Sequence, residues 1–450
     1  MKIRSAAAVL VPGIIFAAAV LGLLAWSSCA PASPPKSAQK IETLTILHTN
    51  DVHAHLLPDE RGRGGWASIA ALIKAKKASQ PDVLVLDGGD MTQGTPVSSI
   101  FYGMPIFQVM NASAYDFAVL GNHEFDNGTS RIREFRDIAN FPLLSANVLE
   151  NGELVADAPT ALVDVDGVRV GIIGVTTSES IHQEDLSFLS PEEVVAKYVP
   201  ALDEQADLIV ALSHLGYERD RELALASEGI DVIVGGHTNT KLEAPVKVGS
   251  TWIAQAGSRG LFLGELDLTL DMETEELLSV EGKLISVPAP GSIPDPEALA
   301  VIQEWEGRVA GPMNVKIGYN PTEQPKSTLK QNIERVWLAT YRTDFAYQNP
   351  GGTRAYLPAG DILVRHIWTA MPFDNTLVVV DLLAEQVRTI MPDAEFQEPK
   401  EYYSVITNSY AGDRMRDRFS LPAERIHPID TVWREPILNY IRRNGHLNPD

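Results

Sequence analysis

Short runs of apolar residues recur along the first 270 residues and predict a series of β-strands. The first stretch, 43–46, alternates polar and apolar positions, which is typical of a strand that enters a sheet. The later runs are almost continuously apolar, as expected for strands buried on both faces. These later strands are expected near residues 82–87, 117–121, 168–175, 207–214, 230–234, 251–256 and 264–270.

Between several of these runs, apolar residues recur at helical spacing and predict helices over 66–78, 104–113, 128–139 and 191–205. Strands that alternate with helices indicate an α/β fold, in which sites form at the carboxyl ends of the strands. The composition changes at Val287, where four prolines mark a linker that leads into an expected helix over 297–309. A second domain is expected from about residue 315 onward.

Five of the strands are followed directly by carboxylate, imidazole or amide side chains. They supply the candidate metal ligands Asp51, His53, Asp90, Asn122, His214, His237 and Asn239. In an extended chain, residues two apart point to the same side, so Asp51 and His53 should aim at one point. One such residue after one strand is more often a helix cap or a turn residue, but five in series indicate a shared site.

Oxygen and nitrogen donors without sulfur suit Mn²⁺, Zn²⁺, Fe²⁺ or Co²⁺. Seven ligands are too many for one ion, whereas a carboxylate can bridge two ions about 3.5–4 Å apart, as in two-metal hydrolases. The chain carries 37 basic and 59 acidic residues, a formal net charge of −22. This charge speaks against nucleic acid or an anionic bilayer as the main partner. An anionic substrate would need the positive charge that metal ions supply.

The N-terminus has the layout of a signal peptide, with a short basic start and an apolar core over residues 6–26. The only cysteine, Cys29, comes at the end of this segment, in a context that resembles a bacterial lipoprotein cleavage site. A stretch rich in Pro, Ala, Ser and Lys follows and is typical of a flexible tether. We therefore expect export to the periplasm or cell envelope of a bacterium, with membrane attachment only through a lipid on Cys29. A secreted chain without the lipid is the alternative.

The order of the ligand motifs resembles that of the calcineurin-like metallophosphoesterases: Asp-x-His, Gly-Gly-Asp, Gly-Asn-His-Glu, His and Gly-Gly-His-Thr-Asn. Residues 47–55 and 121–126 are similar to the 5′-nucleotidase / UDP-sugar hydrolase family, and the resemblance covers residues 43–270. It implies a four-layer α/β/β/α sandwich, followed by a smaller α+β domain that binds substrate. The expected divisions are a signal peptide over 1–29, a tether over 30–41, a metallophosphoesterase domain over 42–286, a linker helix over 287–312 and a C-terminal domain over 313–450.

The resemblance also implies how the ligands divide between two divalent ions. One ion would be held by Asp51, His53, Asp90 and Asn239, and the other by Asp90, Asn122, His214 and His237, so that Asp90 bridges them. Close relatives carry Gln where this chain has Asn239, which keeps the donor type but shortens its reach. By the same resemblance, His123 would face the substrate and stabilise the phosphoryl transition state, oriented by Asp126. A histidine that only caps the turn is the alternative.

In the second domain, the stretches 349–354 and 371–375 resemble family segments that contact the substrate. They imply Asn349 and Arg354 as substrate contacts and Phe373 near the nucleobase, where an aromatic ring can stack on any base. A plain core aromatic is the alternative for Phe373. The family's second aromatic and its Gly-rich loop are shortened here, so that Tyr410 would stack on the base and Asp413 would hold a ribose hydroxyl.

Together these features predict an exported, metal-dependent phosphoric ester hydrolase that acts on small phosphoesters, first of all nucleoside 5′-monophosphates. By the resemblance, water activated by the metals attacks phosphorus in line while His123 assists. The same metal centre could instead serve a UDP-sugar, a 2′,3′-cyclic nucleotide or a sulfur ester. The alternative from another class is a surface-anchored binding protein without turnover.

Overall fold

The structure is a computed structural model that describes residues 40–181 and 183–449. The expected signal peptide, its Cys29 and the tether up to residue 39 lie outside these residues. Among the described residues, no helix combines the length and the apolar character that a membrane span requires.

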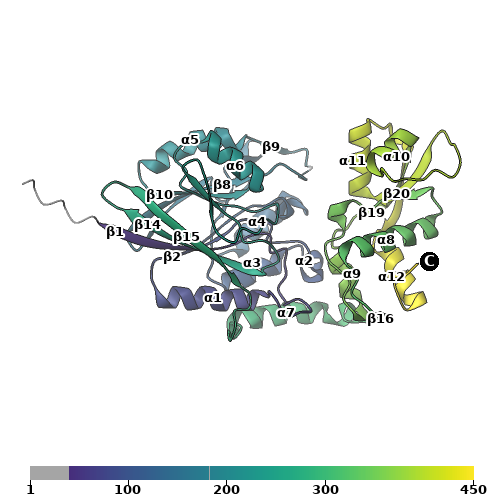
Figure 1. The fold of residues 1–450 in the computed structure, drawn as a ribbon, viewed down its shortest axis with the longest axis horizontal. Helices are drawn as coiled ribbons and strands as arrows, with labels where there is room; N and C mark the ends of the chain where they lie inside the picture. Colours follow the sequence, from purple (N-terminus) through teal and green to yellow (C-terminus); the bar gives the residue numbers. More distant parts are fainter. Residues whose placement is uncertain (1–39, 182, 450) are drawn as a thin grey trace, which may run out of the picture. The chain divides into compact units, whose positions relative to one another are not determined.

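Two six-stranded mixed sheets form the centre of the first domain (Figure 1). The first sheet has the strand order β15-β14-β1-β2-β3-β4, with β1 Ile41–Thr49, β2 Val83–Asp87, β3 Phe117–Val119, β4 Leu143–Leu144, β14 Phe262–Asp271 and β15 Glu276–Ser286. The second has the order β12-β13-β11-β10-β8-β7, with β7 Thr160–Val165, β8 Val168–Thr176, β10 Leu208–His214, β11 Val232–Val234, β12 Val246–Val248 and β13 Thr251–Ala254. Neighbouring strands from β1 to β4 are parallel, as are β8, β10, β11 and β13, so their carboxyl ends share one edge of each sheet.

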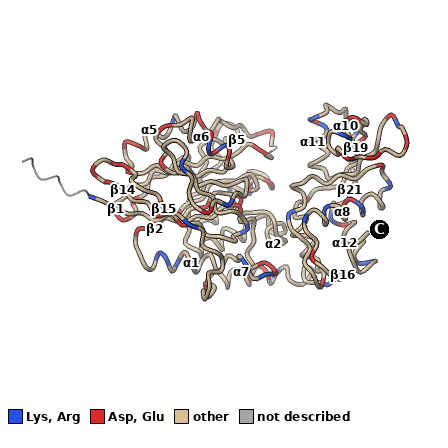
Figure 2. Tube along the Cα trace, viewed as in Figure 1, with Lys and Arg blue, Asp and Glu red and all other residues tan. Residues whose placement is uncertain are grey.

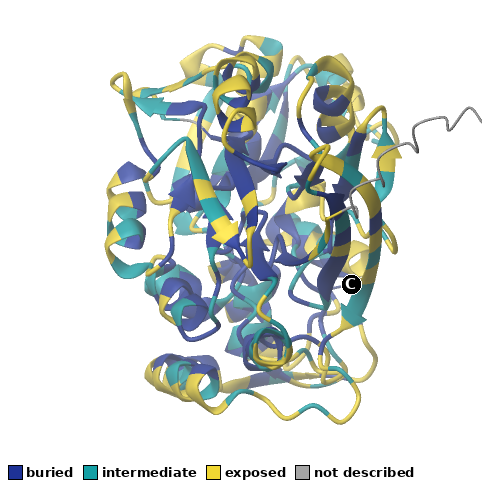
Figure 3. Cartoon of the chain, turned by 90° about the vertical axis from the view of Figure 1, so that its left-hand side faces the viewer, coloured by how far each residue is buried: buried dark blue, intermediate teal, exposed yellow. Residues whose placement is uncertain are grey.

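The two sheets pack face to face, and helices cover the outer face of each. Along β10, alternate residues such as Val210 and Leu212 enter the core between the sheets, whereas Ile209 and Ala211 face the helices. The helices on the side of the first sheet are α1 Trp66–Ser79, α2 Pro96–Ile100, α3 Met104–Asn111, α4 Thr129–Ile138 and α7 Pro296–Met313, and those on the second are α5 Pro191–Asp203 and α6 Tyr217–Ala226. Figure 3 shows the buried strands and the exposed outer faces of helices. This is the four-layer sandwich that the sequence predicts.

Local sequence explains where the helices begin. The helix expected over 191–205 is α5, and it starts at Pro191 because Ser190 forms a capping box with Glu193. The Ser190 hydroxyl accepts from the Glu193 N–H at 3.1 Å, and the Glu193 carboxylate accepts from the Ser190 N–H at 3.1 Å. The helix expected over 297–309 is α7, which begins at Pro296 after the cap Asp295.

The sequence analysis misses the strands that lack a continuous apolar run. In the first domain they are β4, β7, β12, β15 and the small sheet of β5 Val148–Glu150, β6 Glu153–Leu154 and β9 Leu186–Phe188. In β15 most residues are exposed or half-buried, because this strand lies at the edge of the sheet. Edge strands carry polar side chains, so their sequence resembles that of a loop.

The C-terminal domain mixes helices and strands, in agreement with the α+β domain that the sequence predicts. It has a four-stranded sheet with the order β17-β20-β19-β21 and a two-stranded sheet of β16 and β18. The strands are β16 Lys316–Asn320, β17 Phe345–Ala346, β18 Gly360–Leu363, β19 Thr376–Leu382, β20 Tyr403–Asn408 and β21 Ile426–Val432. The helices are α8 Lys326–Tyr341, α9 Val364–Ala370, α10 Ala384–Ile390, α11 Ser409–Phe419 and α12 Glu435–Asn444.

Candidate metal centre and substrate pocket

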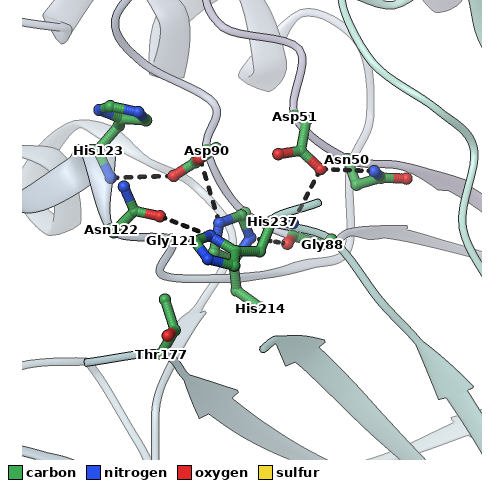
Figure 4. A network of polar contacts seen from close by, with 12 residues as sticks. Asn50, Asp51, Gly88, Asp90, Gly121, Asn122, His123, Thr177, His214 and His237 are labelled. Atoms are coloured by element: carbon green, nitrogen blue, oxygen red, sulfur yellow. Dashed lines mark hydrogen bonds and ion pairs between the residues drawn. The ribbon is translucent and has the colours of Figure 1, made fainter. Parts of the chain in front are cut away.

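The candidate ligands come from loops at the carboxyl ends of five strands, three in the first sheet and two in the second. They are Asp51 and His53 after β1, Asp90 after β2, Asn122 after β3, His214 at the end of β10, and His237 and Asn239 after β11; the candidate catalytic residue His123 directly follows Asn122. Figure 4 shows Asp51, Asp90, Asn122, His214 and His237 gathered in one network. Strand order therefore brings together residues that are far apart in the sequence.

The Asp90 carboxylate lies at the centre of this network. Its Oδ2 atom is 3.2 Å from His214 Nε2 and 3.9 Å from His53 Nε2, and its Oδ1 atom accepts from the His123 N–H at 2.9 Å. Two groups of ligand-type atoms share this carboxylate: Asp90 with His214 and His237, and Asp90 with His53 and His123. Within each group, the atoms lie within 4.8 Å of one another. One carboxylate thus faces imidazoles on two sides.

Two buried polar atoms in the network lack a hydrogen-bond partner, namely Asp51 Oδ1 and His214 Nε2. His214 Nε2 lies close to Asp90 Oδ2, but without hydrogen-bond geometry. Leaving such atoms unsatisfied is costly, and a cation between them would remove the cost. The side chains present therefore fit divalent metal ions, both by their oxygen and nitrogen donors and by these two atoms.

Two candidate ligands, Asn122 and Asn239, differ in whether their side chains lie in the buried network. The Asn122 Oδ1 atom lies 2.9 Å from His237 Nδ1 and points into the network (Figure 4). Asn239 is exposed, and its amide donates to the His237 carbonyl at 3.3 Å. Among the seven candidates, Asn239 is the side chain that the structure places outside the buried cluster, consistent with the shorter reach of Asn compared with Gln.

Charge interactions set the protonation of the cluster. Burial opposes charge on His214, but the Asp90 and Asp51 carboxylates prevail and raise its pKa to about 10. Burial also opposes charge on Asp90, yet His214 and His123 hold its pKa well below the usual value. Burial and the nearby Arg354 guanidinium lower the pKa of His53 well below its usual value. The buried Asp90 carboxylate therefore stays ionised only because positive charge lies beside it.

The loops reach this arrangement through left-handed backbone, which corrects the expectation of an extended Asp51-x-His53 segment. The strand β1 ends at Thr49, and five of the seven candidate ligands have positive φ: 51° at Asp51, 49° at His53, 56° at Asp90, 78° at His237 and 55° at Asn239. Such conformations are tolerated best by Asp, Asn and His, and they gather at functional sites. The side chains converge because each chain turns sharply after its strand.

Close approach between these turns explains two of the glycines in the motifs. A Cβ atom at Gly121 would lie 2.3 Å from the Asp90 N and Oδ1 atoms, and one at Gly236 would lie 2.4 Å from the Gly88 carbonyl. Neither contact is sterically possible without moving backbone. Gly121 thus allows the turns after β2 and β3 of the first sheet to touch, and Gly236 allows a turn of the second sheet to touch the turn after β2.

Glu124 is a residue of the site to which the sequence analysis gave no role. Its buried carboxylate accepts from the Gly121 and Asp90 N–H groups at 2.8 and 3.1 Å, and from the N–H and hydroxyl of Thr92 at 2.9 and 3.0 Å. It therefore joins the turn after β2 to the turn after β3. Its place directly after His123 in the Gly-Asn-His-Glu motif was the available signal. Glu179, whose carboxylate lies 3.3 Å from His237 Nε2, comes from a loop without such a signal.

His123 is held by Asp126, as the resemblance implies. Its Nδ1 atom lies 2.8 Å from Asp126 Oδ2. Burial opposes charge on the ring, but the Asp126 and Asp90 carboxylates raise the His123 pKa to about 9. The ring also stacks on Phe373 at a centroid distance of 5.6 Å and an interplanar angle of 23°. With Nδ1 bound to Asp126, Nε2 is the ring atom available to a ligand.

A cavity of about 380 Å³, the substrate pocket, adjoins this histidine. Residues from both domains line it, among them His123, Asp126, Asn349, Arg354, Phe373 and Tyr410. Arg354 also contacts a candidate metal ligand, because its Nη2 atom lies 2.8 Å from His53 Nε2. Phe373 is half-buried, lines the cavity and packs near Trp433, so its position is compatible with both roles that the sequence left open.

The structure corrects the expectation for Asp413. The stretch 410–413 is part of α11 and not a loop, because Asn408 caps this helix by accepting from the Ala411 N–H at 2.9 Å. The exposed Asp413 carboxylate pairs with Arg416 at 2.7 Å and does not line the substrate pocket. Asp413 is therefore not placed to hold a ribose hydroxyl.

Two buried residues hold the loops of the C-terminal domain that line this cavity. The Asn408 amide donates to the side-chain oxygens of Gln348 and Asn349, each at 2.9 Å. The Arg434 guanidinium donates to the Phe373 carbonyl at 2.6 Å and lies 3.7 Å from the Trp368 ring centroid. Polar contacts under the loops, and not the loops alone, thus set the positions of Asn349 and Phe373.

Comparisons with known proteins agree with this geometry. The family model of the calcineurin-like phosphoesterases matches residues 44–240, and that of the 5′-nucleotidase C-terminal domain matches residues 308–402. Protein UshA of Yersinia enterocolitica is 30% identical over 414 residues, which cover 77% of this chain and 75% of that protein. A 5′-nucleotidase of Vibrio cholerae is 28% identical over 439 residues, which cover 83% of this chain and 79% of that protein.

A solved structure shows the same architecture over nearly the whole chain. The crystal structure of a 5′-nucleotidase precursor from Thermus thermophilus matches with a TM-score of 0.80 at 28% identity, covering 91% of this chain and 98% of that one. The fold and the His/Asp cluster define a metal-dependent phosphoesterase. More narrowly, the chain belongs to the 5′-nucleotidase/UshA family of calcineurin-like metallophosphoesterases.

Asp220 is a buried acid close to the candidate metal ligands, and its raised pKa makes the stability of the native state depend on pH. Asp220 on α6 accepts from the Ser213 hydroxyl at 2.6 Å and from the Gln255 amide at 2.8 Å, and it lies directly against Gly235 in the turn that leads to His237. Burial raises the pKa of Asp220 to about 7. An acid whose pKa rises on folding stabilises the native state below its unfolded pKa, and this stabilisation is lost as pH rises through the folded pKa.

We expect Asp220→Asn to remove this loss. Between pH 5 and pH 8, the unfolding free energy of the wild type should fall by roughly 2–3 kcal/mol relative to that of the variant, because about two pKa units of the shift lie in this range. Urea unfolding of both proteins at the two pH values, at one fixed metal concentration, measures the difference. A difference that stays constant with pH would show that Asp220 is ionised in the native state throughout.

Proposed function

We propose that this chain is an exported hydrolase with two divalent ions that converts nucleoside 5′-monophosphates to nucleoside and phosphate. The observation that carries the proposal is the shared wall between two sites. His123 belongs to the Asp90-centred cluster and also lines the substrate pocket with Phe373 and Tyr410. The proposed site of phosphate chemistry and the proposed site of nucleoside binding are thus adjacent, with His123 in both.

The metal ligands would be those that the sequence indicates. Asp51, His53 and Asp90 with Asn239 would hold one ion, and Asp90 with Asn122, His214 and His237 the other. When bound, two divalent ions neutralise the carboxylates, polarise phosphoryl oxygens and make water a better nucleophile. The donor set suits Mn²⁺, Zn²⁺, Co²⁺ and Fe²⁺ alike.

His123 would hold a proton on Nε2, next to the phosphoryl group, while Asp126 fixes the ring through Nδ1. This arrangement meets negative charge that develops on the phosphoryl oxygens and on the leaving alcohol. Arg354 would bind the same phosphate, because its guanidinium already lies between the pocket and His53. Asn349 would bind the nucleoside, and Phe373 and Tyr410 would stack on the base.

The expected domain divisions, the export and the membrane attachment are also part of this proposal. Residues 1–29 would be a lipoprotein-type signal peptide and 30–41 a tether, followed by the metallophosphoesterase domain over 42–286, the linker helix over 287–312 and the substrate-binding domain over 313–450. Export would place the enzyme where charged nucleotides cannot cross the membrane, and attachment would rest on a lipid at Cys29. A nucleic acid is not expected as a partner, because the net charge is −22.

A substrate panel tests the activity. With Mn²⁺ or Co²⁺ added, we expect kcat/KM for AMP to exceed that for UDP-glucose, 2′,3′-cyclic AMP and a sulfur ester, because the pocket joins a phosphate site to an aromatic nucleoside site. Phosphate or sulfate release and product identification by chromatography measure this. Faster turnover of a non-nucleotide ester would assign the metal centre to that ester. No turnover of any ester would favour a binding protein.

The role of His123 is tested by a pair of coupled variants. His123→Ala should lower kcat for AMP by about 10²–10⁴-fold with a smaller change in KM, as for loss of a proton donor. Asp126→Asn should lower kcat less, and the double variant should be no worse than His123→Ala, since Asp126 acts through the ring.

His427→Ala is the matched control, because His427 also pairs with a carboxylate, Asp381, at 2.9 Å and lies on β21 outside the pocket. It should leave kcat within about twofold of the wild type. Equal effects of His123→Ala and His427→Ala would reduce His123 to a structural residue.

A further inference from the structure

A second cavity in the C-terminal domain shares a wall with the substrate pocket. It has a volume of about 530 Å³, and Asn349 and Tyr410 line both cavities. Its apolar lining includes Tyr347, Ile390 and Met415. This volume lies within the range of cavities that hold ligands, and all of its lining residues belong to one domain. A ligand that reaches Tyr410 in the substrate pocket therefore lies next to this neighbouring pocket.

The neighbouring pocket is also lined by two arginines of α11, Arg414 and Arg418. They are four residues apart and so lie on one side of the helix. Among the described residues, neither forms a salt bridge, whereas Arg416 pairs with Asp413 at 2.7 Å and with Asp417 at 3.0 Å. Asp417 also lines the pocket, and its carboxylate is engaged by Arg416. Charges of both signs thus occur along α11 (Figure 2), but the unpaired ones in the pocket are positive.

The whole chain is acidic, with a net charge of −22, yet among the described residues neither Arg414 nor Arg418 has a carboxylate partner. Guanidinium groups recognise phosphate through paired N–H donors, and two on one helix face can serve one phosphate together. The apolar residues beside them would cover a sugar or a base.

We propose that this neighbouring pocket is a subsite for a second phosphate group carried by the substrate, remote from the 5′-phosphate that is cleaved. The proposal rests on the proposed nucleotidase function. The preferred substrates are then nucleotides that extend past the nucleoside, either a nucleoside bisphosphate or a 5′-phosphorylated dinucleotide. Arg414 and Arg418 bind the remote phosphate, and Tyr410 separates it from the base in the substrate pocket.

The test compares substrates that differ only in the remote phosphate. Adenosine 3′,5′-bisphosphate, adenosine 2′,5′-bisphosphate and the 5′-phosphorylated dinucleotide pApA are each compared with AMP on the metal-loaded chain, and loss of the 5′-phosphate is identified by chromatography. For at least one of the three, kcat/KM should exceed that for AMP. Which of them it is distinguishes a ribose phosphate from a phosphodiester.

Variants then assign the preference to the arginines. Arg414→Gln and Arg418→Gln should each lower the preference over AMP by about threefold, and together by about tenfold, as expected for charge-assisted hydrogen bonds to phosphate. Arg416→Gln, on the same helix but paired with Asp413 and Asp417, should leave the preference within about twofold. Equal loss in Arg416→Gln would indicate a general effect of charge, and no loss in the double variant would overturn the subsite.

A binding measurement keeps the subsite testable apart from catalysis. In metal-loaded His123→Ala, titration calorimetry should give a lower Kd for the preferred bisphosphate or dinucleotide than for AMP, and the double arginine substitution should abolish the difference. If the wild type does not hydrolyse AMP but this difference is present, the proposed function fails and the subsite stands. If AMP is hydrolysed but the difference is absent, the subsite fails alone.

Discussion

The Asp90 carboxylate lies where the ends of strands from two sheets meet, and its surroundings constrain the rest of the site. His214 comes from the second sheet, while His53 and the His123 N–H come from the first, and all three approach this one group. A buried carboxylate needs positive charge or hydrogen-bond donors beside it, and Asp90 has the His214 ring from the second sheet and the His123 N–H from the first. The candidate site therefore forms where the strand ends of the two sheets meet, at the edge of the apolar core between them.

This arrangement is supported by residues that touch no substrate. Glu124 ties the turn that carries Asp90 to the turn that carries Asn122 and His123, and Asp220 supports the turn that leads to His237. Left-handed backbone at the ligands stores strain, which these buried hydrogen bonds offset. In the C-terminal domain, Asn408 and Arg434 do the same for the loops with Asn349 and Phe373. Buried hydrogen bonds thus fix both the loops that carry the candidate metal ligands and the loops of the C-terminal domain.

Much of this could be predicted from the sequence, because buried parallel strands leave continuous apolar runs and the ligands follow them directly. The strand ends and the positions of the motifs rest on that signal, whereas the four layers were implied by the resemblance to the calcineurin-like metallophosphoesterases. The edge strand β15 was not predicted, because its exposed residues do not form an apolar run. Asp413 was misplaced because the sequence suggested a loop, whereas the cap at Asn408 starts a helix there. Glu179 and the arginines of α11 depend on tertiary contacts that no local pattern encodes.

The central claim is that Asp90 joins two metal ions on one chain. The most direct test is elemental analysis of the chain lacking residues 1–29, dialysed after loading with Mn²⁺ or Co²⁺. The account predicts two ions per chain for the wild type and for Asp126→Ala, which removes a neighbouring carboxylate that is not a ligand, and less than one ion for Asp90→Ala. One ion per chain in the wild type, or two ions retained by Asp90→Ala, would contradict it.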